Sequence, residues 1–112
     1  MQKTVAAIVL SMAAFVSASS ASTMLASWYG PGFHGRTTAN GERYDMHGFT
    51  AAHKDLPFGT ELRVCYQGCV DVQVNDRGPF VGTRELDLSY GAAKAIGLIN
   101  AGVAKVDVKI LS

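Results

Sequence analysis

Glycine and proline divide this chain into short extended stretches, and this spacing of turn residues limits the folds that the chain can adopt. Alternating apolar residues predict strands over 24–29, 49–52, 61–66, 70–75, 85–88 and 105–111. Turn signals separate them, such as Gly30-Pro31-Gly32 and Asn40-Gly41. One short helix is predicted over 90–96, with Ser89 as its N-cap and Gly97 at its end. Short strands with a single helix favour a closed β-barrel, which leaves no strand edge exposed.

Size and charge narrow the classes of protein that fit this pattern. The 112 residues are enough for one ordinary domain, and a hydrophobic content of 48% is enough to build its core. The formal net charge is +1, and the basic residues form no run. A nucleic-acid groove needs a concentrated positive field, so nucleic acid is excluded as the expected partner.

The first 21 residues have the pattern of a secretory signal peptide. Lys3 precedes an uncharged run from residue 4 to 16, and small residues follow it up to Ala21. Cleavage after Ala21 fits best and cleavage after Ala18 is the rival, which gives a signal peptide over 1–21 and one domain over 22–112. The alternative is a retained membrane anchor, although the run is short for a permanent span. We expect a periplasmic or secreted protein with no permanent membrane anchor.

The two cysteines, Cys65 and Cys69, both lie in the part expected to be exported. An oxidising compartment makes a disulfide the default interpretation. The segment between them suits a hairpin tip, in which Gly68 is expected to take a positive φ. The alternatives are a redox pair, which usually has a C-x-x-C spacing, or a metal pair, for which two thiols are too few.

Three polar residues at strand ends and turns are candidates for catalysis. Glu42 follows the Asn40-Gly41 turn, His53 follows a short apolar strand, and Asp76 ends a valine-rich strand. Cleavage of a glycosidic bond needs a protonated carboxyl group and a nearby negative charge, which Glu42 and Asp76 could supply with His53 orienting one of them. The alternative is structural, with Glu42 solvated and Asp76 either capping its own loop or pairing with Arg77.

Aromatic residues gather where the first predicted strand ends. Trp28, Tyr29 and Phe33 lie beside glycines, and sugar rings pack their C–H faces on aromatic rings. Since neighbours on a strand face opposite ways, Trp28 and Tyr29 cannot both face the core, and Trp28 is the one for which a core position is the main alternative.

Several motifs in order then resemble one known family. The chain closely resembles the rare lipoprotein A family over nearly all of residues 22–112. The motifs that carry this resemblance are Ala26-Ser27-Trp28-Tyr29-Gly30, residues 33–42 (FHGRTTANGE), Thr50-Ala51-Ala52-His53, Leu56-Pro57-Phe58-Gly59-Thr60, residues 74–80 (VNDRGPF) and Asp87-Leu88-Ser89. The resemblance implies a mainly β fold, a six-stranded double-psi β-barrel with one or two short helices, as in expansins and barwin-like proteins.

The resemblance also implies an activity and a set of site residues. Characterised members of the family are lytic transglycosylases, which prefer peptidoglycan strands stripped of stem peptides. It marks Asp76, Glu42 and His53 as catalytic and implies substrate contacts from residues of the matched motifs: Trp28, Tyr29, Phe33, Asn40, Asn75 and Arg77. Asp76 would protonate the glycosidic oxygen, and the muramic 6-hydroxyl would attack the anomeric carbon with Asp76 or Glu42 as base, giving a 1,6-anhydro sugar. No cofactor or metal is expected.

Two other functions remain open at this point. The same barrel in expansins implies a glycan-binding or wall-loosening protein without bond cleavage, and fold alone does not decide between the two. Soluble export would also permit an effector or inhibitor that acts on another organism. The expected partner is the peptidoglycan glycan strand, and the expected state is a monomer.

Overall fold

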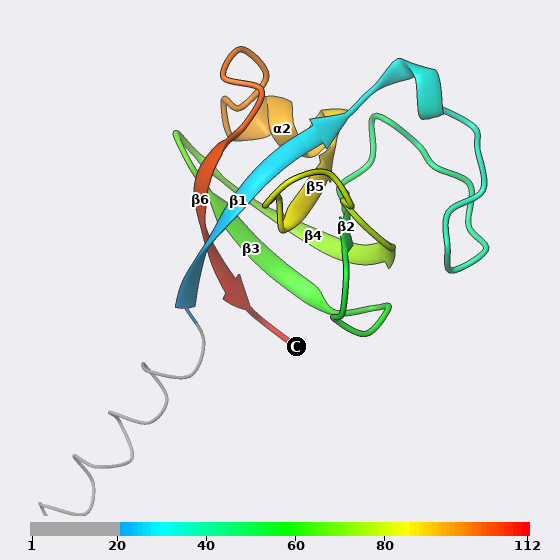
Figure 1. The fold of residues 1–112 in the computed structure, drawn as a ribbon, viewed down its shortest axis with the longest axis horizontal. Helices are drawn as coiled ribbons and strands as arrows, with labels where there is room; N and C mark the ends of the chain where they lie inside the picture. Colours follow the sequence, from blue (N-terminus) through cyan, green and yellow to red (C-terminus); the bar gives the residue numbers. More distant parts are fainter. Residues whose placement is uncertain (1–20) are drawn as a thin grey trace, which may run out of the picture.

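Six strands with alternating buried and exposed side chains close into a barrel in the computed structural model, which describes residues 21–112 (Figure 1). The barrel order is β1-β5-β2-β4-β3-β6. Within residues 21–112 two helices accompany the strands, the 3-10 helix η1 and the α-helix α2. The bounds are β1 Ala21–Tyr29, η1 Pro31–Phe33, β2 Thr50–His53, β3 Glu61–Cys65, β4 Cys69–Asp76, β5 Leu86–Ser89, α2 Tyr90–Ala95 and β6 Ala104–Ile110. The predicted mainly β barrel is confirmed, although β1 begins three residues earlier than expected.

The barrel mixes parallel and antiparallel ladders. β1 pairs with β5, and β2 with β4, in parallel, whereas the other four ladders are antiparallel. Parallel neighbours cannot be joined by a tight turn, so the chain must cross between them. These crossings place β5 between β1 and β2, and β2 between β5 and β4.

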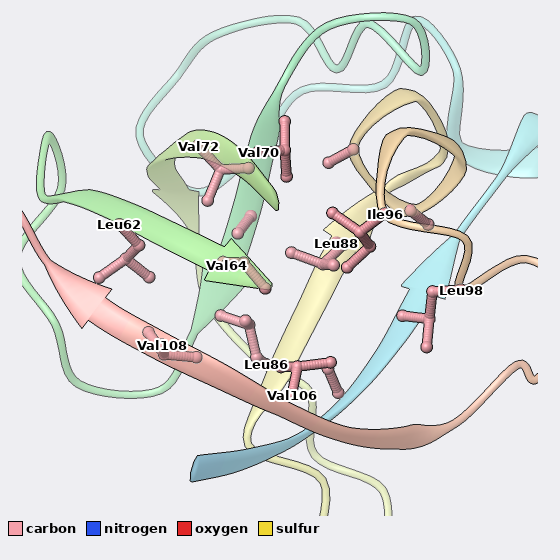
Figure 2. Packing of buried hydrophobic residues seen from close by; sticks show 14 of the residues in the cluster. Leu62, Val64, Val70, Val72, Leu86, Leu88, Ile96, Leu98, Val106 and Val108 are labelled. Carbon is pink, nitrogen blue, oxygen red and sulfur yellow. The ribbon is translucent and has the colours of Figure 1, made fainter. Parts of the chain in front are cut away.

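The core lies inside the barrel and under α2 (Figure 2). Each strand contributes every second residue, as the alternation of the sequence predicted. In β4, for example, Val72 and Val74 are buried while Asp71 and Gln73 between them are exposed. The largest fully buried side chains are Leu62, Leu86, Leu88, Ile96, Leu98, Val64, Val72, Val74, Val106 and Val108.

Ser89 fixes the start of α2 and the chain segment that precedes β2. Its hydroxyl accepts a hydrogen bond from the backbone N–H of Ala92 at 3.3 Å, so the predicted N-cap is confirmed. The same hydroxyl donates to the carbonyl of Gly48 at 2.7 Å. Gly97 follows the helix with φ +77°, a value that favours glycine.

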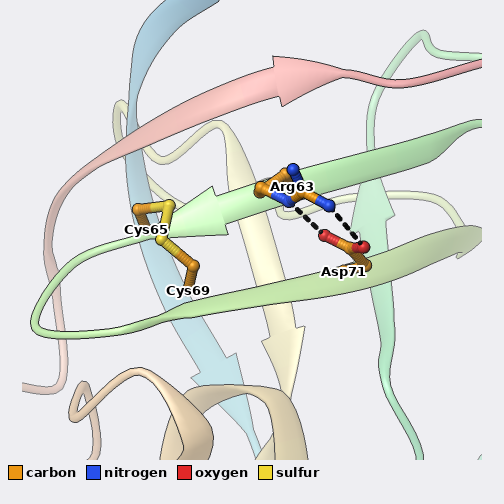
Figure 3. Close-up of a disulfide and its surroundings, with 4 residues drawn as sticks. All are labelled: Arg63, Cys65, Cys69 and Asp71. Carbon is orange, nitrogen blue, oxygen red and sulfur yellow. Dashed lines mark hydrogen bonds and ion pairs between the residues drawn. A yellow bond between two sulfur atoms is a disulfide. The ribbon is translucent and has the colours of Figure 1, made fainter.

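The β3–β4 hairpin carries the predicted disulfide between Cys65 and Cys69 (Figure 3). The two residues are direct partners in the ladder, and Arg63 and Asp71 form an exposed ion pair at 2.8 Å further along it. The expected positive φ of Gly68 is wrong, because Gly68 is not among the residues with positive φ. A Cβ on Gly68 would lie 3.1 Å from the carbonyl oxygen of Ala95, so close packing against the end of α2 explains this glycine better.

The segment 30–49 extends from the end of β1 before the chain returns as β2 (Figure 1). Tyr44 attaches it to the barrel: its side chain is buried, and its hydroxyl donates to the carbonyl of Tyr29 at 2.8 Å and accepts from the backbone N–H of Tyr90 at 3.1 Å. The segment also passes close to α2, since a Cβ on Gly91 would lie 2.7 Å from the carbonyl oxygen of His47.

The predicted signal peptide falls outside the described residues except for Ala21, which begins β1. Over residues 21–112 no helix is long and apolar enough to cross a membrane.

Candidate functional site

The candidate site is built around Ala52, a small residue of β2 with an acidic partner on each side. In the β2–β4 ladder Ala52 pairs with Asp76, and in the β2–β5 ladder it pairs with Asp87. The Cα atoms of the two aspartates are therefore two strand spacings apart, about 9–10 Å. Ala52, Asp76 and Asp87 all line one cavity of about 450 Å³. The methyl group of Ala52 thus forms the floor between two carboxyl groups.

A bulge in the β2–β4 ladder lets two successive side chains at the end of β4, Asn75 and Asp76, contact the same segment, residues 39–42. The β2–β4 register passes from Val74 directly to Asp76, so Asn75 is the extra residue. Asn75 is buried, and its Nδ2 donates to Oε1 of Glu42 at 3.1 Å. Asp76 reaches the same segment, since its Oδ1 accepts from the backbone N–H of Ala39 at 2.9 Å.

Asp76 is held in place by backbone donors. Its Oδ1 also accepts from the N–H of Arg77 at 2.9 Å, which makes two backbone hydrogen bonds on one oxygen. Hydrogen bonds of this kind orient a carboxylate without neutralising its charge. The second carboxylate oxygen is left free for contact with a ligand, since no hydrogen bond to it is formed within residues 21–112.

The turn 38–42 packs against the end of β4 and places Glu42 beside Asn75. Oδ1 of Asn40 accepts from the Thr38 hydroxyl at 2.6 Å and from the N–H of Glu42 at 3.1 Å, so Asn40 shapes the turn from within. Hydrogen bonding from Asn40 first, and from Asn75 second, lowers the pKa of Glu42, which is exposed. Glu42 is therefore an ionised group next to the cavity, and it is not among the lining residues.

Asp87 has a different environment from Asp76. Burial, the largest cause, raises the pKa of its carboxyl group from the ordinary 3.8 to about 6, and the negative charge of Asp76 also raises it. Two neighbours act in the opposite direction: the Ser27 hydroxyl, which donates to Oδ1 of Asp87 at 3.0 Å, and the positive charge of Arg84. Asp87 can thus carry a proton at a pH at which ordinary carboxyl groups have lost theirs.

Three arginines, Arg36, Arg77 and Arg84, line the cavity with the aspartates. The guanidinium group of Arg77 lies 3.9 Å from the centre of the Phe58 ring, and its Nη1 donates to the carbonyl of His53 at 3.3 Å. Arg36 lies over the Phe33 ring at 5.6 Å. This mixture of aromatic and charged groups suits a polar ligand with apolar faces.

The structure does not bring the His53 imidazole into this cavity. The imidazole lines a second depression, with Lys54, Asp55 and Glu85. Its Nδ1 accepts from the N–H groups of Asp55 at 3.0 Å and Leu56 at 3.1 Å, and burial is the main cause that lowers its pKa. His53 contacts the main site through its backbone, by the hydrogen bond from Arg77.

The predicted aromatic contacts divide between the cavity and the barrel. Tyr29 and Phe33 line the cavity, packed edge to face at 5.7 Å, and Tyr29 also stacks on Tyr44 at 4.5 Å. Trp28 instead packs against the core and lies edge-on to Tyr90 at 5.6 Å, so its alternative as a core residue fits better.

Of the residues predicted from sequence, Asp76, Tyr29, Phe33 and Arg77 line the cavity, while Glu42, Asn40 and Asn75 form the turn and bulge beside it. Sequence reasoning missed Asp87 as a member of the site. Its signal was the alternation in 85–88, where Asp87 stands between Leu86 and Leu88 and therefore had to face away from the core. Over residues 21–112 no three His, Cys, Asp or Glu side chains are grouped so that they could hold a metal ion.

The fold and the site together define a double-psi β-barrel domain with a carboxylate-lined cavity on the outside of the barrel. The structure is similar to that of the apo expansin of Clavibacter michiganensis, with a TM-score of 0.67 and 26% identity over 82% of this chain and 50% of the expansin. Residues 21–108 match the family model described as lytic transglycolase, and the chain belongs to this family.

Curated relatives carry a more specific name. The chain is 56% identical over 90 residues to the probable endolytic peptidoglycan transglycosylase RlpA of Synechocystis sp., and 52% identical over 90 residues to the endolytic peptidoglycan transglycosylase RlpA of Campylobacter jejuni. Each match covers 78% of this chain. The matched region spans only 28% and 33% of the two relatives.

Proposed function

We propose that this protein is a peptidoglycan lytic transglycosylase, which cleaves the bond between N-acetylmuramic acid and N-acetylglucosamine and releases a 1,6-anhydro product. The observation that carries the proposal is Asp76, a carboxylate oriented by two backbone N–H groups at a cavity of about 450 Å³. Proton transfer at a glycosidic bond needs a carboxyl group fixed in this way. Family membership and the names of the relatives agree with this chemistry.

The lining of the cavity suits a glycan strand that bears few stem peptides. Phe33 and Phe80 are exposed aromatic residues at the cavity, on which a sugar ring can pack a C–H face. Arg36, Arg77 and Arg84 offer charged donors for hydroxyl and carboxylate groups. An unsubstituted muramic acid carries a free carboxylate, which these donors would accommodate.

Glu42 and His53 support this site without lining the cavity. Glu42 is ionised and bonded to Asn75, so it adds negative charge near a positively charged transition state. His53 positions Arg77 through its carbonyl group. Both are proposed as residues on which activity depends, and Asp76 as one that exchanges a proton with substrate. The disulfide fits a periplasmic or secreted location.

The second candidate is a protein that binds cell-wall glycan without cleaving it. The similarity to the expansin barrel is the observation that favours it. One experiment separates the two functions: the purified protein is incubated with peptidoglycan from which stem peptides have been removed, and the products are analysed by mass spectrometry.

Anhydro-sugar products are expected, and Asp76→Asn should lower their rate of formation at least 100-fold. The Asn oxygen can still accept both backbone hydrogen bonds, so this variant should remain folded. Asp107→Asn is the matched control, because it makes the same change at an exposed position of β6 outside the cavity. If the wild-type protein yields no anhydro product at high concentration yet is retained on glycan in a pull-down, the binding function is correct instead.

A further inference from the structure

Asp87 is a partly buried carboxyl group that the proposed catalytic set leaves unused. It faces the cavity that contains Asp76, and it lies on the other side of Ala52. We infer that Asp87 is the proton donor of the reaction and that Asp76 is the base, an assignment that rests on the proposed transglycosylase function.

The placement of the two carboxyl groups supports this division of roles. Both are ladder partners of Ala52, so their Cα atoms are about 9–10 Å apart on the face that the Ala52 methyl group leaves open. Cleavage of a glycosidic bond by a pair of carboxyl groups needs one on each side of the bond, and Asp76 and Asp87 line one cavity on either side of Ala52. A span of this size gives room for the glycosidic oxygen and the attacking hydroxyl group.

The surroundings of Asp76 suit a base, and those of Asp87 suit a proton donor. Asp76 accepts two backbone N–H bonds on Oδ1, which fix the orientation of its carboxylate and leave its second oxygen open to the cavity. Asp87 has the pKa of about 6 described above, because burial disfavours its charged form. A carboxyl group whose surroundings favour its protonated form is suited to act as a general acid. The charged and titratable groups that face Asp87 come from β4, the segment before β5, β1 and the segment 30–49: Asp76, Arg84, Tyr29 and Tyr44.

The burial that raises the pKa of Asp87 also has a consequence for stability. A carboxyl group that loses its ordinary hydration on folding destabilises the protein at neutral pH. Its hydrogen bond from Ser27 is not one that requires a charge, because asparagine could accept it equally well. A residue that is unfavourable for stability and faces a cavity is typical of a functional site.

The step balances without water. Asp87 gives its proton to the glycosidic oxygen as the bond from that oxygen to the anomeric carbon breaks, and the electron pair of the bond stays on the oxygen. The 6-hydroxyl oxygen of muramic acid then bonds to the positively charged anomeric carbon, and its proton passes to the Asp76 carboxylate. After the product leaves, solvent carries the proton from Asp76 back to Asp87.

The test measures anhydro-product formation on denuded peptidoglycan between pH 4 and 9 for the wild-type protein, Asp87→Asn and the control Asp107→Asn. We expect Asp87→Asn to lower the rate at least 100-fold while its circular dichroism spectrum and its retention on glycan are unchanged. The wild-type rate should fall as pH rises above about 6, where Asp87 loses its proton, and Asp107→Asn should show the same profile.

The outcomes distinguish this inference from the function on which it rests. If the wild-type protein forms no anhydro product, the transglycosylase function is wrong, and the role of Asp87 is wrong with it. If the wild-type protein is active and folded Asp87→Asn keeps more than a tenth of its rate, only the assignment of Asp87 is wrong. Loss of rate together with loss of glycan retention would also overturn it, because Asp87 would then be a binding residue.

Discussion

Replacing Asp87 with asparagine should make the protein more stable at neutral pH, which is unusual for a change in a cavity. In the folded state its pKa rises from the ordinary 3.8 to about 6, chiefly through burial. Between these two pH values the folded state binds more protons than the unfolded state, so stability falls as pH rises through this window. Above it, the ionised side chain destabilises the folded state by about 3 kcal/mol.

Asparagine removes this charge and keeps an oxygen that can accept the Ser27 hydrogen bond. The amide N–H group of asparagine needs a hydrogen-bond partner in the cavity, and its imperfect pairing reduces the gain in the free energy of unfolding by about 1 kcal/mol. The net stabilisation at pH 7.5 is then about 2 kcal/mol. For a domain of this size, that corresponds to an increase in Tm of about 8–16 °C.

The assay is thermal unfolding of the wild-type protein and of Asp87→Asn, followed by circular dichroism at intervals from pH 3.5 to 8. Near pH 4 wild-type Asp87 is protonated in the folded protein, so the advantage of the variant should disappear there. The difference in Tm between the two proteins should grow as pH rises through the window. A variant that is less stable at pH 7.5, or a difference that does not depend on pH, would refute the view that Asp87 is a buried carboxyl group with a raised pKa.

Two further predictions concern how the segment 30–49 is held on the barrel. Tyr44→Phe removes a hydroxyl group with two backbone partners and should lower the free energy of unfolding by about 1–3 kcal/mol in chemical denaturation; an unchanged midpoint would mean that these bonds do not hold the segment. Gly91→Ala places a Cβ 2.7 Å from the carbonyl oxygen of His47 and should destabilise the protein by about 1–3 kcal/mol, whereas an unchanged Tm would show that the segment moves away freely.

Local chemistry alone determined most of the secondary structure. Strands such as β4 follow from side chains that alternate between apolar and polar, since a strand in a closed sheet exposes one face to the core and the other to solvent. The start of α2 followed from Ser89, because a hydroxyl group at that position satisfies an N–H group that the helix leaves free. The disulfide followed from two cysteines on either side of a tight hairpin.

Only the tertiary structure decided which acidic residues meet. Asp76 and Asp87 are eleven residues apart in the chain, and nothing local indicates that each is a ladder partner of Ala52. That pairing depends on the order of the strands in the closed barrel and on a bulge that shifts the register by one residue. The side chain of His53 also depends on the tertiary structure. Its position at the end of β2 was visible in the sequence, but the N–H groups of the turn that follows donate to its Nδ1 and hold the imidazole outside the main cavity. A strand pattern predicts which face a side chain is on, whereas the neighbours on that face come from segments distant in the chain, and they also set the burial that raises the pKa of Asp87.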